Sequence, residues 1–194
     1  MKRHLFLFAL NLFGIGLYAQ NSAPPEPSKI SWYTGIGFEN LALPFQDIPS
    51  HFSNPGLVLG VQRYYGASRR FFQQAQLGYQ HNRDFGSNYA VYSHFGWEQQ
   101  WLSGLSSRLY LGLGWRYSNH PVDAMRFNNG IWEASNKGKS QLSIPLGLSL
   151  KYSKKATSLL SPFLNYEVNP SLFYNQTIPA VLFSKLTVGT FINL

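Results

Sequence analysis

The chain has 194 residues, with 16 Lys and Arg, 8 Asp and Glu and no cysteine, so stabilising disulfides are excluded. Without Lys2 and Arg3 at the start of the chain, 14 basic residues face 8 acidic ones, a net charge near +6. Nucleic-acid binders gather such charge in one patch or stripe. Here the cations are scattered between turns and strand patterns, so we expect no nucleic-acid partner.

The first 19 residues have the pattern of a cleaved secretory signal peptide. Lys2, Arg3 and His4 precede an apolar stretch that runs from residue 5 to 17, and Ala19 is a small residue at the expected cleavage point. A membrane anchor is the alternative, but this apolar stretch is shorter than the ~20 residues of a spanning helix. Residues 20–29 are rich in proline and are expected to form a flexible periplasmic segment.

From residue 30 onward, apolar residues fall at every second position. In the clearest segment, Leu109, Leu111 and Leu113 alternate with Tyr110 and Gly112. Successive side chains of a strand point to opposite faces. An apolar face opposite a face of Gly, Gln, Ser and charged residues is typical of a strand with lipid on one side and a polar barrel lumen on the other.

Eight segments share this alternation. In chain order they lie at about 30–41, 56–66, 70–82, 88–100, 106–118, 139–152, 158–169 and 181–194. Pro145 has no N–H for the strand ladder, so we expect a bulge there. Short turns at 66–69, 103–104 and 154–157 alternate with longer connections at 42–55, 83–87, 119–138 and 170–180. The sequence therefore predicts one all-β domain over residues 30–194, an eight-stranded antiparallel transmembrane β-barrel with short periplasmic turns and longer extracellular loops.

Aromatic residues of the outward face gather near the strand ends. They are Trp32, Tyr65, Tyr79, Trp97, Trp115, Tyr117 and Tyr152. In a membrane barrel they would form the aromatic girdles at the two lipid–water boundaries. The alternative is a soluble lipocalin-like barrel, in which the apolar face would point inward and the girdle would have no role.

The inward face carries a nearly balanced set of ionisable residues. They are Glu39, His94, Glu98, Arg108, Arg116, Lys151, Glu167 and Lys185. Side chains just fill the interior of an eight-stranded barrel, and an unpaired buried charge costs several kcal/mol. We therefore expect a plug of paired charges, with a narrow pore or a catalytic carboxylate pair as alternatives. The histidines lack metal-ligand spacing, so neither a metal nor a cofactor is expected.

Two loops carry candidate functional residues. In the first, the string from Ser50 to Asn54 resembles the motif of outer-membrane lipid A deacylases, which implies that His51 activates Ser53 to attack an acyl ester. Turn chemistry before the second strand is the alternative. The 119–138 loop is long enough to bind a partner or to cover the barrel mouth. Its candidate contact residues are His120, Asp123, Met125, Arg126 and Phe127.

Several strings carry a resemblance to a known group of proteins. They are the leader end Tyr18-Ala19-Gln20 and the segments 51–60, 77–81 and 111–117. The chain resembles small outer-membrane barrels of Bacteroidota-type bacteria, and its architecture is similar to that of OmpA-like and OmpX-like barrels. The resemblance implies an outer-membrane location, contact with lipid including lipopolysaccharide, and a structural or binding role without enzymatic activity. It also implies a larger outer-membrane protein as a partner, with the chain as an accessory subunit in transport, secretion or assembly.

Overall fold

The computed structural model describes residues 30–41, 52, 54–66, 68–82, 86–101, 104–119, 124–128, 130–135, 138–154, 158–173 and 179–193. The predicted leader 1–19, the segment 20–29 and the pair His51 and Ser53 lie outside these residues. The described strands are β1 (Ile30–Asn40), β2 (Pro55–Tyr65), β3 (Phe71–Asn82), β4 (Gly86–Gln100), β5 (Leu105–Asn119), β6 (Ala124–Asn128), β7 (Ile131–Ser135), β8 (Gly138–Ser143), β9 (Leu146–Tyr152), β10 (Leu160–Leu172) and β11 (Ala180–Asn193). Across the same ranges, no helix is long and apolar enough to cross a membrane.

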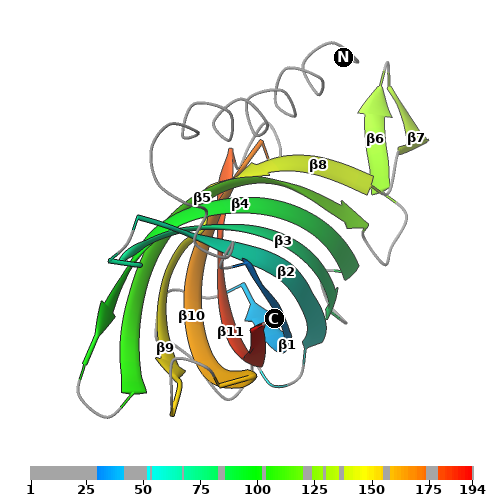
Figure 1. Ribbon diagram of the computed structural model, residues 1–194. Coiled ribbons are helices and arrows are strands. Elements are labelled where there is room, and N and C mark those ends of the chain that lie inside the picture. Colours follow the sequence, from blue (N-terminus) through cyan, green and yellow to red (C-terminus); the bar gives the residue numbers. More distant parts are fainter. Residues whose placement is uncertain are drawn as a thin grey trace.

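The main sheet is antiparallel and closes on itself (Figure 1). Each strand from β1 to β4 pairs with the next, and β5 pairs with both β8 and β9. Both of these pair with β10, β10 pairs with β11, and β11 returns to β1. Because β8 and β9 occupy a single place in the ring, the barrel has eight members. This arrangement confirms the predicted eight-stranded antiparallel barrel.

The interruption between β8 and β9 lies at the expected proline. Pro145 has no N–H to donate, but its carbonyl accepts from the Gly112 amide at 2.7 Å, and the Ile144 amide donates to the Pro170 carbonyl at 3.0 Å. The sixth predicted strand is therefore broken locally while both neighbours stay attached. A proline within a sheet is tolerated at such an irregularity.

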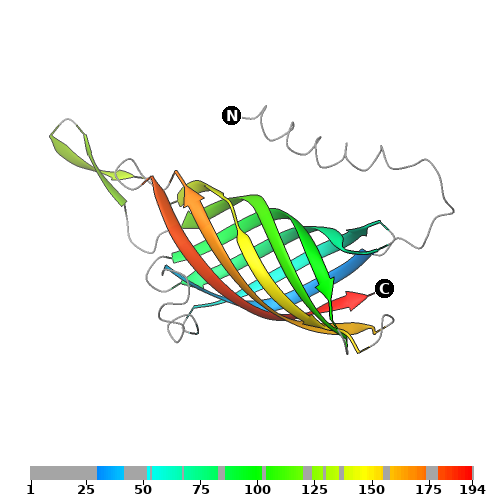
Figure 2. The ribbon, with the colours of Figure 1, turned by 90° about the vertical axis from the view of Figure 1, so that its left-hand side faces the viewer.

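The connections differ from expectation at two places. The β3–β4 connection spans only residues 83–85, because Asn82 pairs with Gly86 and Gly86 adopts a positive φ of 81°. The 119–138 segment, predicted as a long loop, contains the β6–β7 hairpin, in which Phe127 lies opposite Trp132. Figure 2 shows this hairpin projecting beyond one end of the barrel, whereas β11 ends at the opposite end.

The two faces of the wall differ as the alternation predicts. The outward residues Leu57, Leu77 and Leu111 are 61%, 58% and 57% exposed, whereas the neighbouring Val58 and Tyr110 are buried. An inward apolar face, as in a lipocalin-like barrel, is contradicted by these exposures. The wall of this barrel has the apolar outer surface of a transmembrane β-barrel.

Interior aromatic rings lie against glycines of the neighbouring strand. The pairs are Tyr33 with Gly60, Phe72 with Gly96, Tyr92 with Gly114, Tyr110 with Gly147 and Phe163 with Gly189. A Cβ atom built on Gly147 would lie 2.2 Å from Cζ of Tyr110, so the ring occupies space that only glycine leaves free. Aromatic cover of a strand glycine is a known stabilising device in sheets.

Candidate functional site

The predicted inward-facing ionisable residues lie in the interior and gather around three carboxylates. We name the groups the Glu39 cluster, the Glu98 cluster and the Glu167 cluster. Every member comes from an inward position of a strand, so the period of two places them in the lumen. Which charges form ion pairs then depends on which strands lie opposite one another across the lumen.

In the Glu39 cluster, Arg116 of β5 reaches across the lumen to Glu39 of β1. The guanidinium donates hydrogen bonds to both carboxylate oxygens, at 3.0 Å and 2.5 Å. Asn88 donates to the same carboxylate at 3.2 Å, and the guanidinium carbon lies 3.7 Å from the ring centre of Phe183. A two-point Arg–carboxylate pair of this kind is strong and directional, so it fixes β1 against β5.

In the Glu167 cluster, two donors hold one buried carboxylate. Lys185 of β11 lies directly opposite Glu167 in the β10–β11 register, and its Nζ is 2.8 Å from Oε1. The hydroxyl of Tyr110 donates to Oε2 at 2.9 Å. His94 Nε2 is 3.9 Å from Oε2, which is too far for a hydrogen bond. The His94 ring instead packs against Tyr110, with ring centres 4.8 Å apart.

In the Glu98 cluster, one carboxylate faces two cations. Lys151 Nζ lies 2.7 Å from Oε1, and Arg108 Nε lies 3.3 Å from Oε2. The Tyr64 hydroxyl donates to Oε2 at 2.5 Å and accepts from Lys151 at 2.6 Å. Arg108 also donates to Gln62, and its guanidinium carbon lies 4.1 Å from the ring centre of Phe72.

A small cavity lies among these clusters in the described interior. It offers about 10 Å³ to the centre of a water molecule, which is room for about one water. Its lining includes Gln76, Ser149, Asn165 and Thr187. Each carboxylate pairs with cations and not with another carboxylate, so the geometry does not support a catalytic carboxylate pair. Among the described residues, no group of three or more His, Cys, Asp or Glu is placed to hold a metal ion.

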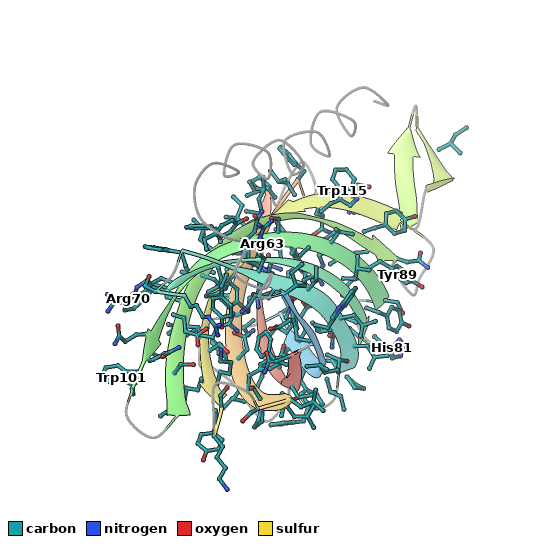
Figure 3. All side chains as sticks on the ribbon, viewed as in Figure 1. Arg63, Arg70, His81, Tyr89, Trp101 and Trp115 are labelled. Atoms are coloured by element: carbon teal, nitrogen blue, oxygen red, sulfur yellow. The ribbon has the colours of Figure 1, made fainter. Side chains whose placement is uncertain are left out.

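The predicted girdle residues lie on the outward face. Tyr65 is half-buried and the rest are exposed: Trp32, Tyr79, Trp97, Trp115, Tyr117 and Tyr152. The register places Tyr79, Tyr89 and Tyr117 side by side on β3, β4 and β5. Figure 3 shows Tyr89 toward one end of the strands and Trp101 toward the other. Tyr89 and Trp101 were not predicted as girdle residues, although their outward positions near strand ends are the signal that identifies them.

The inward tyrosines Tyr64 and Tyr110, which donate to carboxylates, were not predicted as members of the polar network. Of the partner-binding candidates, Met125, Arg126 and Phe127 belong to β6. The other two candidates, His120 and Asp123, lie outside the described residues.

No protein-family model and no curated protein matches the sequence. Solved structures do match. Neisserial surface protein A aligns with a TM-score of 0.58 at 9% identity, over 85% of this chain and 96% of that chain. Ail, the attachment invasion locus protein of Yersinia pestis, aligns with a TM-score of 0.54 at 11% identity, over 87% and 100%. At these identities the likeness concerns the fold, which is that of small outer-membrane eight-stranded β-barrels.

Proposed function

We propose that this chain is an exported integral protein of a bacterial outer membrane with a structural or binding role and no enzymatic activity. In this proposal residues 1–19 are a cleaved signal peptide, and residues 20–29 lie in the periplasm. The observation that carries it is the contrast between the apolar wall and a polar interior in which the carboxylates are paired with cations. Such a barrel offers only its outer wall and its loops to other molecules.

The finer part of the proposal is an accessory role in a larger outer-membrane complex for transport, secretion or assembly. The β6–β7 hairpin supports it, because this two-stranded sheet is separate from the barrel sheet and projects beyond its end (Figure 2). In the described structure each of its strands pairs only with the other, so each has an outer edge that can take a further strand. The hairpin is therefore the proposed contact with the larger protein, while lipid, including lipopolysaccharide, surrounds the wall.

The test is affinity purification of the tagged chain from its native membranes in mild detergent. We expect the chain in the outer-membrane fraction, together with one membrane protein in stoichiometric amount. A variant in which a Gly-Ser linker replaces residues 124–135 should keep its barrel and lose the partner. A chain recovered alone contradicts the accessory role, and a chain found in the soluble fraction contradicts the whole proposal.

The hydrolase alternative has no support among the described residues. Its candidates His51 and Ser53 lie outside the described residues, and no observation of the described structure favours acyl hydrolysis.

A further inference from the structure

Three polar side chains interrupt the apolar outer wall on neighbouring strands. They are Arg63 of β2, Gln73 of β3 and Ser93 of β4, and together with Tyr65 we call them the polar seam. The Tyr65 hydroxyl donates to Gln73 Oε1 at 2.6 Å, and Gln73 Nε2 donates to Ser93 Oγ at 3.4 Å. The Arg63 guanidinium carbon lies 5.8 Å from the ring centre of Tyr65.

The seam lies within a surface that is otherwise built for lipid. Leu59, Leu77 and Val91 on the same three strands are all more than half exposed. A charged side chain on the lipid face of a barrel is destabilising unless its charge reaches a polar group. Among the described residues, no acid forms an ion pair with Arg63, which is exposed on the outer side of β2 (Figure 3). Within the described residues, the seam thus presents an exposed cation with no acid beside it.

The hydrogen-bond donors that the seam does not use internally indicate the chemistry of a ligand that would fit it. The Tyr65 hydroxyl donates its proton to Gln73, and Gln73 donates one of its two amide protons to Ser93. The protons left to donate are the Arg63 guanidinium protons, the second amide proton of Gln73 and the hydroxyl proton of Ser93. A surface that presents donors and one positive charge fits a ligand that carries acceptor oxygens and negative charge.

The positive charge of the nearby turns also favours an anionic ligand. Arg63 lies two residues before β2 ends, at the end of the barrel where the short turns lie. The turn segments 66–70, 101–104 and 153–159 contain four cations and no Asp or Glu. The positive field of these turns raises the local concentration of anions at this end.

We propose that the polar seam binds the phosphate group of a phospholipid in the leaflet at the short-turn end of the barrel. The planar guanidinium of Arg63 holds two phosphate oxygens, and Gln73 and Ser93 donate to the remaining oxygens of the phosphate and the glycerol esters. The acyl chains then lie along the neighbouring leucines. The occupant is a lipid because the wall around the seam is continuous apolar surface of the kind that lipid covers. This inference rests on the proposed membrane location.

The test measures lipid retention by the full-length barrel, refolded in neutral detergent, with native mass spectrometry after addition of phosphatidylglycerol. We expect one phospholipid on the wild-type protein and about tenfold weaker retention by Arg63→Gln, since hydrogen bonds to charged groups are worth enough for one decade in affinity. Arg70→Gln is the matched control. Arg70 is an exposed cation in the adjacent turn, outside the seam. Its loss removes only part of the turn charge, so it should lower retention far less than Arg63→Gln does.

Three further measurements keep the proposal testable if Arg63→Gln folds poorly. Arg63→Lys keeps the charge but loses the planar fork, so it should retain the lipid at an intermediate level. Diacylglycerol, which has the same acyl chains and no phosphate, should not be retained. Inorganic phosphate should not displace the bound phospholipid, because it lacks the acyl chains that the wall contacts.

Several outcomes would overturn the inference. They are equal retention by wild type and Arg63→Gln, equal loss in Arg63→Gln and Arg70→Gln, retention of diacylglycerol, and displacement by inorganic phosphate. A photo-crosslinker at position 73 that captures a protein in native membranes would assign the seam to a protein instead. A chain that fails to float with vesicles contradicts the proposed function, whereas a chain that floats without retaining phospholipid overturns only this inference.

Discussion

Glu98 is the single carboxylate between two interior cations, Arg108 and Lys151. Glu98→Ala would leave both cations enclosed without an acid. Removing one partner from a buried ion pair destabilises a protein by about 3–5 kcal/mol. We expect a loss of that order in the free energy of unfolding, measured by urea titration of the barrel in vesicles with tryptophan fluorescence.

The next residue provides the control for this change. Gln99 points to the outer wall, and among the described residues its side-chain amide donates only to the adjacent Gln100 carbonyl. Gln99→Ala should therefore change stability by no more than about 0.5 kcal/mol. Equal stability of the two variants would contradict the role assigned to Glu98.

The Glu39–Arg116 pair predicts strong coupling between two residues. Arg116→Met leaves Glu39 buried without its cation, and Glu39→Leu leaves Arg116 without its acid. Replacing both partners of a buried pair by apolar residues is often neutral or stabilising. The double variant should therefore lose at least about 1 kcal/mol less than the sum of the single losses. Additive losses in the same urea titration would show that the two side chains do not act as a pair.

Which residues face inward could be predicted from the sequence, because the side-chain period of a strand is two and one register error reverses every residue. Which of these charged residues form ion pairs could not be predicted. Glu39 and Arg116 are 77 positions apart, and their contact depends on the shear of the closed ring, which alternation does not encode. The tyrosine donors were missed for a related reason, since an inward tyrosine alone does not show which carboxylate it reaches.

Among the elements, the ring-over-glycine pairs give a sharp test. A Cβ atom on Gly147 would lie 2.4 Å from the hydroxyl oxygen of Tyr110, the group that donates to Glu167. Gly147→Ala should therefore displace the ring, weaken that hydrogen bond and destabilise the barrel by about 1–3 kcal/mol, as other overpacking substitutions do. The measurement is the temperature at which the folded band disappears in heat-modified gel electrophoresis.

Gly78 is the matched control, because it also lies in a strand but its added Cβ would meet only Ala90 Cβ at 3.9 Å. Gly78→Ala should leave stability unchanged or raise it by about 0.4–1 kcal/mol, since alanine reduces the freedom of the unfolded chain. If Gly147→Ala and Gly78→Ala lose their folded bands at the same temperature, the close contact with the Tyr110 ring does not exclude a side chain at position 147.

At the level of elements, the barrel strands could be predicted to within a few residues, but the β6–β7 hairpin could not be recognised from alternation. Its strands have only five residues each, too few for a clear period. The usable signal was Asn129-Gly130 between two short runs, which is a strong hairpin turn sequence. Turn chemistry is thus the better guide where strands are short.

The whole barrel is expected not to conduct ions, because its three ion-paired clusters lie in one lumen and an ion must pass all of them. Planar-bilayer recordings of the wild-type protein should show no discrete current steps at any salt concentration. The Glu39→Ser, Arg116→Ser double variant removes only one cluster. It should also stay closed, because Glu98 and Glu167 keep their partners Lys151 and Lys185. Steps in the wild-type recordings, with an amplitude that grows with salt, would mean that the paired side chains leave a continuous aqueous path. Steps that begin only in the double variant would assign the whole barrier to the Glu39 cluster.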